Sequence, residues 1–168
     1  DPYKFKFNQD SLKADGKLFD AEESSSDYSI LNTIPATSPD YYPTAATIAL
    51  MKILNDASLS VHHNIVIKAI LSIVEQLSQS QIRPLVRFIL PSFIARIRSC
   101  DNNIRETLLL QLGELITIMG HLVHDYLAQI FDIIHDYWNG FLLVIISIIE
   151  TLSLVVTEGF KVYLPSAI

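Results

Sequence analysis

The chain has 168 residues, a formal net charge of −6 and a composition that is half hydrophobic. This length fits one domain with a real hydrophobic core. The acidic balance and the absence of a Lys and Arg cluster exclude a nucleic-acid binder, because phosphate neutralisation needs clustered cations. The single cysteine, Cys100, excludes an internal disulfide framework and a paired-cysteine zinc or redox site, and it fits a reducing compartment.

The first quarter of the chain differs in composition from the rest. Residues 8–40 contain the acidic and serine-rich run from Glu22 to Asp27, two prolines, and few apolar residues at any regular interval. Such a segment cannot bury enough apolar surface to offset the entropy of ordering it. We therefore predict a flexible, disordered insertion at residues 8–40. Residues 1–7 are assigned to the end of a preceding repeat of the helical array described next.

From Pro43 onward, apolar residues recur at helical spacing. Pro43 and Pro84 suit the first turn of a helix, where a missing N–H costs no hydrogen bond. Asp101 or Asn102 can cap one helix, and a turn at residues 139–140 precedes the last. The expected helices span about residues 43–56, 62–78, 83–99, 102–119, 121–138 and 141–157. The most apolar run, residues 141–149, is too short for a membrane span of about 20 residues, so it is read as a buried helix.

A constant offset of 37 residues relates similar positions along the chain. Leu90, Leu127 and Leu164 are spaced by this offset, and Ile67, Ile104 and Phe141 are spaced in the same way. A fixed period in this range, with two helices per period, is typical of an α-solenoid. Each helix pair in such an array buries one face only by stacking on the next pair. The pattern predicts an all-α fold with about three antiparallel helix pairs over residues 41–168. These pairs are expected to be an excerpt of a longer array.

The central repeat, residues 88–115, resembles a HEAT repeat: an internal proline in the first helix, then Asp-x-x-Ile-Arg-Glu, then Leu-Gly-x-Leu. Pro91 is expected to bend the first helix around its partner, because it removes one backbone hydrogen bond. Asp101 is expected to cap the second helix, and Arg105 to meet an acidic group at the turn between the helices. Gly113 is expected to let the helices approach closely.

Longer stretches resemble the target of rapamycin (TOR) kinase family. They are Asp1-Pro2-Tyr3-Lys4 and residues 42–43, 49–53, 56–63, 99–106 and 160–165. The resemblance covers nearly the whole chain and corresponds to the middle of that family's long N-terminal HEAT region, upstream of the kinase domain. It implies that the parent protein is a nutrient-responsive serine/threonine protein kinase, whose HEAT solenoids dock accessory subunits and help to form a dimer.

No catalytic, cofactor or metal site is expected in this segment. The Gly-rich loop, His-Arg-Asp and Asp-Phe-Gly motifs of a kinase are absent from the sequence, as is a Walker motif. Cys100 lies beside Asp101, whose charge is expected to raise rather than lower the pKa of the thiol. His62 and His63 are read as polar surface. So are the histidines and aspartates of residues 121–138, although His121 with Asp125, or Asp132 with Asp136, could chelate one metal ion.

The resulting prediction is a non-catalytic scaffold segment of a cytoplasmic TOR-type complex, which also reaches endomembrane surfaces. Its expected partners are accessory subunits and a second TOR protomer, with no nucleic acid, direct membrane insertion or small-molecule substrate. Phe131, Tyr137 and Trp138 are candidate partner contacts, because aromatic residues dominate interface hot spots. Packing of these three residues between repeats is the favoured alternative. A free-standing helical-repeat adaptor, of the transport or phosphatase scaffold type, is the alternative function.

Overall fold

The computed structural model describes residues 29–155. The predicted end of a preceding repeat at residues 1–7, residues 8–28 of the predicted insertion, and Leu164 of the repeating pattern lie outside this range. Residues 29–32 form one helical turn. The later elements, in which η denotes a 3-10 helix, are α2 (Tyr41–Asn55), η2 (Ala57–His62), α3 (His63–Gln76), α4 (Gln79–Ser99), α5 (Asn102–Met119), η3 (Gly120–Tyr126), α6 (Leu127–Tyr137) and α7 (Leu142–Val155).

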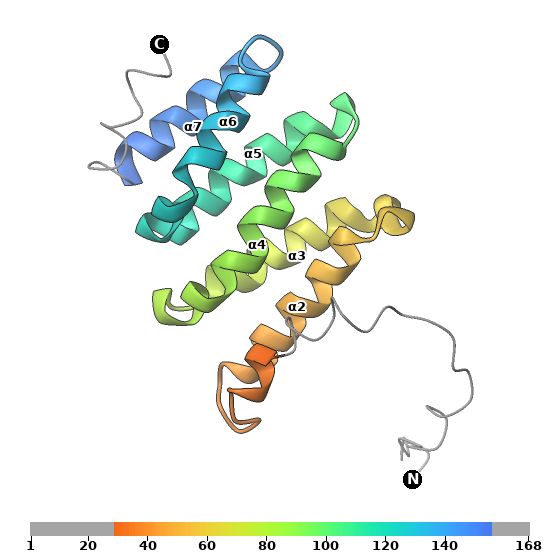
Figure 1. Cartoon of the computed structure of the whole chain (residues 1–168), viewed down its shortest axis with the longest axis vertical. Coiled ribbons are helices and arrows are strands. Elements are labelled where there is room, and N and C mark those ends of the chain that lie inside the picture. The colour runs from red at the N-terminus through yellow and green to blue at the C-terminus, as the bar shows by residue number, and fades with distance from the viewer. Residues whose placement is uncertain (1–28, 156–168) are drawn as a thin grey trace.

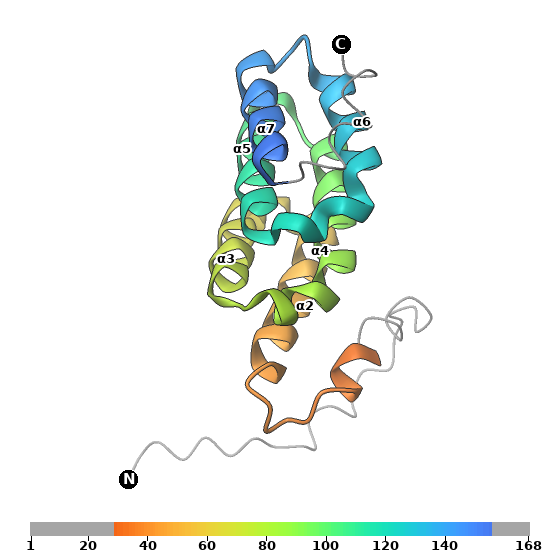
Figure 2. The same cartoon turned by 90° about the vertical axis from the view of Figure 1, so that its left-hand side faces the viewer.

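Successive α-helices run antiparallel and stack in two layers (Figures 1 and 2). One layer contains α2, α4 and α6, in which each helix contacts the next, and the other contains α3, α5 and α7. No strand interrupts the series between residues 29 and 155. The predicted all-α solenoid of three antiparallel helix pairs is therefore confirmed, as the pairs α2–α3, α4–α5 and α6–α7.

The 37-residue offset corresponds to neighbours in space. Asn55, at the end of α2, donates through Nδ2 to Oγ of Ser92 on α4 at 3.3 Å, and these residues are 37 positions apart. Near the start of α4, Gln79 Nε2 donates to the carbonyl oxygen of Ile118 on α5 at 3.0 Å. Gln81 on α4 donates through Nε2 to Oδ1 of Asp40, the residue that precedes α2. Polar contacts therefore join the first pair to the second through α2 and α4, and join α4 to α5 within the second pair.

Two of the predicted helices differ from the structure. The helix expected at 83–99 begins at Gln79, so Pro84 lies inside α4 and its predicted first-turn position was wrong. The helix expected at 121–138 is divided into η3 and α6. Pro84 and Pro91 are seven residues apart and therefore share one face of α4. The carbonyls of Ser80 and Arg87, which lose a helical partner to these prolines, belong to exposed residues that water can reach.

One continuous hydrophobic core runs through all three pairs, from Met51 on α2 to Leu152 on α7. Phe93 on α4 and Leu112 on α5 are completely buried in it. The apolar residues that recur at helical spacing within residues 104–119 and 122–137 provide many of the core side chains, with Leu108, Leu115 and Ile130 fully buried. Burial of this kind stabilises each pair only when its neighbours are present, because the core lies between pairs.

Gly120 breaks the helical path between α5 and η3. Its φ of 57° and ψ of −134° lie where only glycine is comfortable, because it has no Cβ. Two stretches, Ala57–Gln76 and Asn102–Tyr137, are long and apolar enough to cross a membrane by length and composition alone. The second stretch is not one straight helix here, since it contains α5, the break at Gly120, η3 and α6. Both contribute side chains to the solenoid core.

Candidate protein-interaction surface

Arg105 donates hydrogen bonds across the corner between α4 and α5, which is the turn where α4 ends at Ser99 and α5 begins at Asn102. Its Nε donates to the carbonyl oxygen of Ile97 at 2.9 Å, and its Nη2 donates to the carbonyl oxygen of Cys100. Its Nη1 donates to Oδ1 of Asn102. The expected acidic partner was therefore wrong, because Arg105 instead satisfies carbonyls at the C-terminal end of α4, which have no partner within the helix. A cation at this end is also favoured by the helix dipole.

The other HEAT-pattern residues lie around the same pair of helices. Asp101 occupies the N-cap position of α5, but its side chain makes no capping hydrogen bond, contrary to the expected role. Gly113 faces α7, and a Cβ at this position would lie 3.8 Å from Cγ1 of Ile148, which is an ordinary contact distance. Burial, not Asp101, raises the pKa of the Cys100 thiol, whose Sγ donates to the carbonyl oxygen of Ile97. The corner is structural, not nucleophilic.

The corner between α2 and α3 is organised by His63. This side chain is buried, so its prediction as polar surface was wrong, whereas His62 is exposed. His63 Nε2 lies 3.0 Å from the carbonyl oxygen of Ile53 and 2.9 Å from that of Asp56. Both partners are acceptors, so Nε2 carries the hydrogen. The sequence offered one usable signal, the apolar spacing of His63 with Ile67 and Ile70.

The three candidate aromatic contacts have different environments. Phe131 is partly buried against the core. Tyr137 packs inward, with its ring edge-to-face with Phe141 at 6.2 Å and the Arg105 guanidinium 4.7 Å from its ring centroid. Trp138 follows at the end of α6 and is 37% exposed. Tyr137 is therefore a packing residue, and Trp138 is the aromatic side chain of the three that a partner can reach most directly.

The polar face of α6 and η3 is solvent-exposed, as predicted. The exposed residues are His121, His124, Asp125, Asp132, His135 and Asp136. Asp136 pairs with Arg98 of α4 at 3.7 Å, and both side chains are about half exposed. Among residues 29–155, no group of three or more His, Cys, Asp or Glu side chains has the arrangement needed to hold a metal ion. This face presents charges and donors to the outside of the solenoid.

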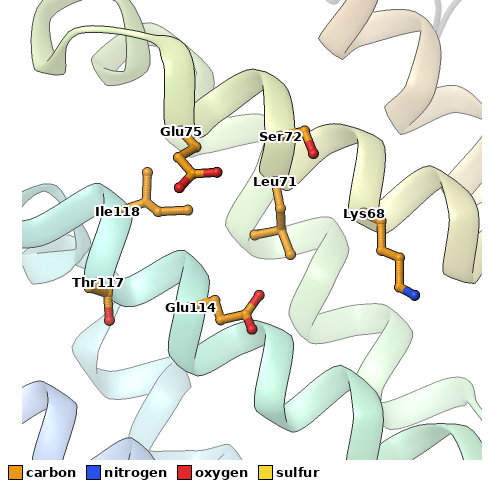
Figure 3. Close-up of a pocket in the computed structure, with 7 residues that line it drawn as sticks. All are labelled: Lys68, Leu71, Ser72, Glu75, Glu114, Thr117 and Ile118. Atoms are coloured by element: carbon orange, nitrogen blue, oxygen red, sulfur yellow. The ribbon is translucent and has the colours of Figure 1, made fainter.

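A shallow groove separates α3 and α5 in the opposite layer (Figure 3). Its volume is about 480 Å³, and Lys68, Glu75 and Glu114 provide the charged groups along its sides. Leu71 and Ile118 provide apolar surface between them. The side chains come from two neighbouring repeats, so the groove exists only because the pairs are stacked. It can receive part of a protein partner, and it contains no paired nucleophile and base for catalysis.

Helix α7 presents an exposed apolar row. Leu143 is 82% exposed, Leu154 is 78% exposed and Ile146 is 47% exposed, whereas Ile145 and Ile148 on the other side of the helix are buried. Exposed apolar side chains that cluster on one helix face usually mark a surface that another element covers. Helix α7 is the last helix of the described stack, where it packs against α5 and α6 (Figure 1).

Comparison with known proteins identifies the family of the chain. A sequence profile described as "Serine/threonine-protein kinase mTOR domain" matches residues 1–120, which is more than half of the chain. The chain belongs to this family. A Drosophila melanogaster relative, "Serine/threonine-protein kinase mTor", is 32% identical across the whole chain. The Saccharomyces cerevisiae relative "Serine/threonine-protein kinase TOR2" is 33% identical over 83% of the chain, and the Arabidopsis thaliana "Serine/threonine-protein kinase TOR" is 29% identical over 77%.

The mTOR-family chain spans only a small part of these relatives. It covers 7% of the length of the Drosophila protein and 6% of the yeast and plant proteins. The matched region is an N-terminal, non-kinase segment of those relatives. The resemblance to the TOR kinase family is thus confirmed, and the segment lies outside the kinase part of these relatives. The helical corners and grooves described above belong to a part of the family that precedes the catalytic domain.

Proposed function

We propose that this segment is a non-catalytic scaffold of a TOR-type serine/threonine protein kinase, and that it holds an outer surface in position for accessory subunits and for dimer assembly. The observation that carries the proposal is the single core that continues through all three helix pairs. Because each pair is buried against its neighbours, the exposed faces of α6 and α7 are held in one geometry. The segment needs no cofactor for this role and acts in the cytoplasm, including endomembrane surfaces.

Two exposed features support a docking role. The exposed side of α6 carries Asp132 and His135 beside the accessible ring of Trp138, and interfaces commonly combine an aromatic anchor with a polar rim. The apolar row of α7 is a second surface, which we expect further helices of the longer protein to cover, as in other repeat arrays. The first surface is suited to a separate subunit, and the second to continuation of the solenoid.

The test uses the intact parent protein, affinity-purified from cells and analysed by mass spectrometry. The variant Asp132→Lys with His135→Glu changes the α6 surface, and Glu106→Lys on the exposed face of α5 is the matched control. We expect one co-purifying subunit to be lost from the α6 variant alone, while kinase activity on a soluble substrate is retained. Equal subunit content in the wild type, the α6 variant and the control would show that the segment acts as a spacer that sets geometry. Absence of kinase-complex subunits even from the wild type would favour the free-standing adaptor.

A further inference from the structure

Helix α4 carries four arginines and no acidic residue, in a chain with a net charge of −6. Two of the four have polar partners: Arg98 pairs with Asp136, and Arg96 Nη1 donates to Oγ of Ser99 at 3.5 Å. Arg83 and Arg87 are exposed in the first half of the helix, and no ion pair joins either to another residue between 29 and 155. This half of α4 therefore carries two positive charges that the described part of the chain does not neutralise.

These two arginines line a groove of about 300 Å³ between α4 and η3, named here the α4–η3 groove. The guanidinium of Arg87 also lies 4.8 Å from the ring centroid of Phe88, which lines a separate hollow between α2 and α4, and this cation–π contact leaves its N–H donors available. The groove combines cationic and apolar surface. Its other lining residues include His121, His124, Leu122 and Tyr126.

One acidic residue also lines the groove, and no ion pair joins it to either arginine. Asp125 has a side chain that is 93% exposed, and its Oδ1 lies 4.0 Å from Nδ1 of His124. A carboxylate so exposed is screened by water and contributes little to the potential inside the groove. Arg87 also lines a smaller hollow of about 140 Å³ between α2 and α4.

The groove in the other layer has the opposite charge balance. The α3–α5 groove of Figure 3 has Glu75 and Glu114 beside one lysine, Lys68. The two grooves thus differ in the sign of their charge. A partner segment that is attracted to the α4–η3 groove is repelled by the α3–α5 groove, and this difference favours one orientation of docking.

The chemistry of the groove fits carboxylates carried on a peptide. Guanidinium groups bind carboxylates through paired N–H donors, and Leu122 and Tyr126 offer surface to an apolar side chain. A volume of about 300 Å³ accommodates a few side chains. A nucleic-acid backbone would need a longer basic track than two arginines, and the chain is acidic overall. We propose that the α4–η3 groove binds an acidic peptide segment of a partner protein, with its carboxylates on Arg83 and Arg87. This deepens the docking role proposed above and rests on it.

The probe is a fluorescent ten-residue peptide of Glu and Asp with one central Leu and one photo-crosslinking residue. Binding to the intact protein is followed by fluorescence anisotropy, and the same peptide with Gln and Asn in place of Glu and Asp is the ligand control. We expect Arg83→Gln with Arg87→Gln to weaken binding at least about 10-fold, because each lost charged hydrogen bond reduces affinity severalfold. Arg98→Gln, outside the groove, should stay within about twofold.

Two further measurements keep the result interpretable. Arg83→Lys with Arg87→Lys keeps both charges and should retain part of the affinity, which a folding defect would not allow. Cross-links should map to α4 and to residues 120–126. The proposal would be overturned if the wild type did not bind the peptide, or if the Arg83→Gln, Arg87→Gln protein bound it undiminished. Cross-links that map elsewhere, or tighter binding of single-stranded DNA through the same arginines, would overturn it as well. Loss of a subunit from the α6 variant would still support the docking role, so the two proposals fail separately.

Discussion

At the corners that follow α2 and α4, different side chains satisfy backbone carbonyls of the same kind. At each corner a helix ends, the chain turns, and carbonyl oxygens of the last turn are left without helical partners. At the first corner, His63 Nε2 approaches two carbonyl oxygens, those of Ile53 and Asp56. At the second, Arg105 brings a separate donor to each acceptor and stacks on Tyr137 from the end of α6.

The difference lies in the number of donors and in permanent charge. One N–H of His63 is shared between two acceptors, and its buried Nδ1 has no hydrogen-bond partner. Arginine has five donors in a rigid fork and remains charged at every physiological pH. The Arg105 corner therefore also links α4 to the next pair through Tyr137, whereas the His63 corner closes its own pair. We expect the second corner to be the stronger of the two.

Removal of the Arg105 side chain should have the largest effect. Arg105→Ala leaves the carbonyls of Ile97 and Cys100 without their charged donor, which costs about 2–4 kcal/mol of local stability. Hydrogen exchange of the amides at the end of α4 and the start of α5, measured in the intact protein, should become much faster. Arg105→Lys, which keeps the charge but not the fork, should fall between wild type and alanine. Unchanged exchange in the alanine variant would show that the corner is held by the backbone alone.

Removal of the His63 side chain should have a smaller effect. His63→Ala should cost about 1–3 kcal/mol, because two carbonyls lose one shared donor and a small cavity forms. The readout is exchange at the end of α2 and the start of α3. His62→Ala, one residue earlier and exposed, is the control and should change stability by less than about 0.5 kcal/mol. A loss as large as that of Arg105→Ala would remove the proposed difference between the corners.

The link between the second corner and α6 can be tested at Tyr137. Tyr137→Leu should cost about 0.5–1 kcal/mol through loss of the cation–π contact, and exchange at the end of α6 should report it. Tyr137→Phe keeps the ring and should behave like wild type. In an Arg105→Ala background the effect of Tyr137→Leu should shrink, which a double-mutant cycle measures. Additive effects would mean that the two side chains act independently.

The smallest expected effect is a pH dependence at the first corner. The hydroxyl of Ser58, and then its backbone N–H, donate to Asp56 Oδ1 and hold the pKa of that carboxyl below its ordinary value of 3.8. A lowered folded-state pKa contributes stability that is present above pH 3.8 and is lost as the pH falls through the lowered pKa. Exchange of the η2 amides, normalised to an unfolded peptide, should show this loss. Asp56→Asn should abolish the pH-dependent part of the exchange. An exchange profile identical to that of the wild type would show that another group causes the pH dependence.

Local periodicity predicted the helices well and the corners poorly. Leu108, Leu112 and Leu115 recur at helical spacing, and all three are fully buried. His63 was read as surface, because a histidine at a helix start is usually solvated and nothing in its neighbours reveals the carbonyls above it. Arg105 was placed at the correct corner but with the wrong kind of partner. That Arg83 and Arg87 line one groove with His121 and His124 was also not predicted, because the two sets lie on different elements.

The sequence by itself determined the all-α class, the helix pairs and their 37-residue repeat, because helical spacing and turn residues act over a few positions. The resemblance to the TOR kinase family likewise came from sequence segments. Only the tertiary structure decided which donor satisfies each helix end, that Gly113 faces Ile148 with room for a Cβ, and that the grooves on the two layers differ in charge. These features depend on how neighbouring pairs stack, and the stacking brings together residues that local spacing cannot relate.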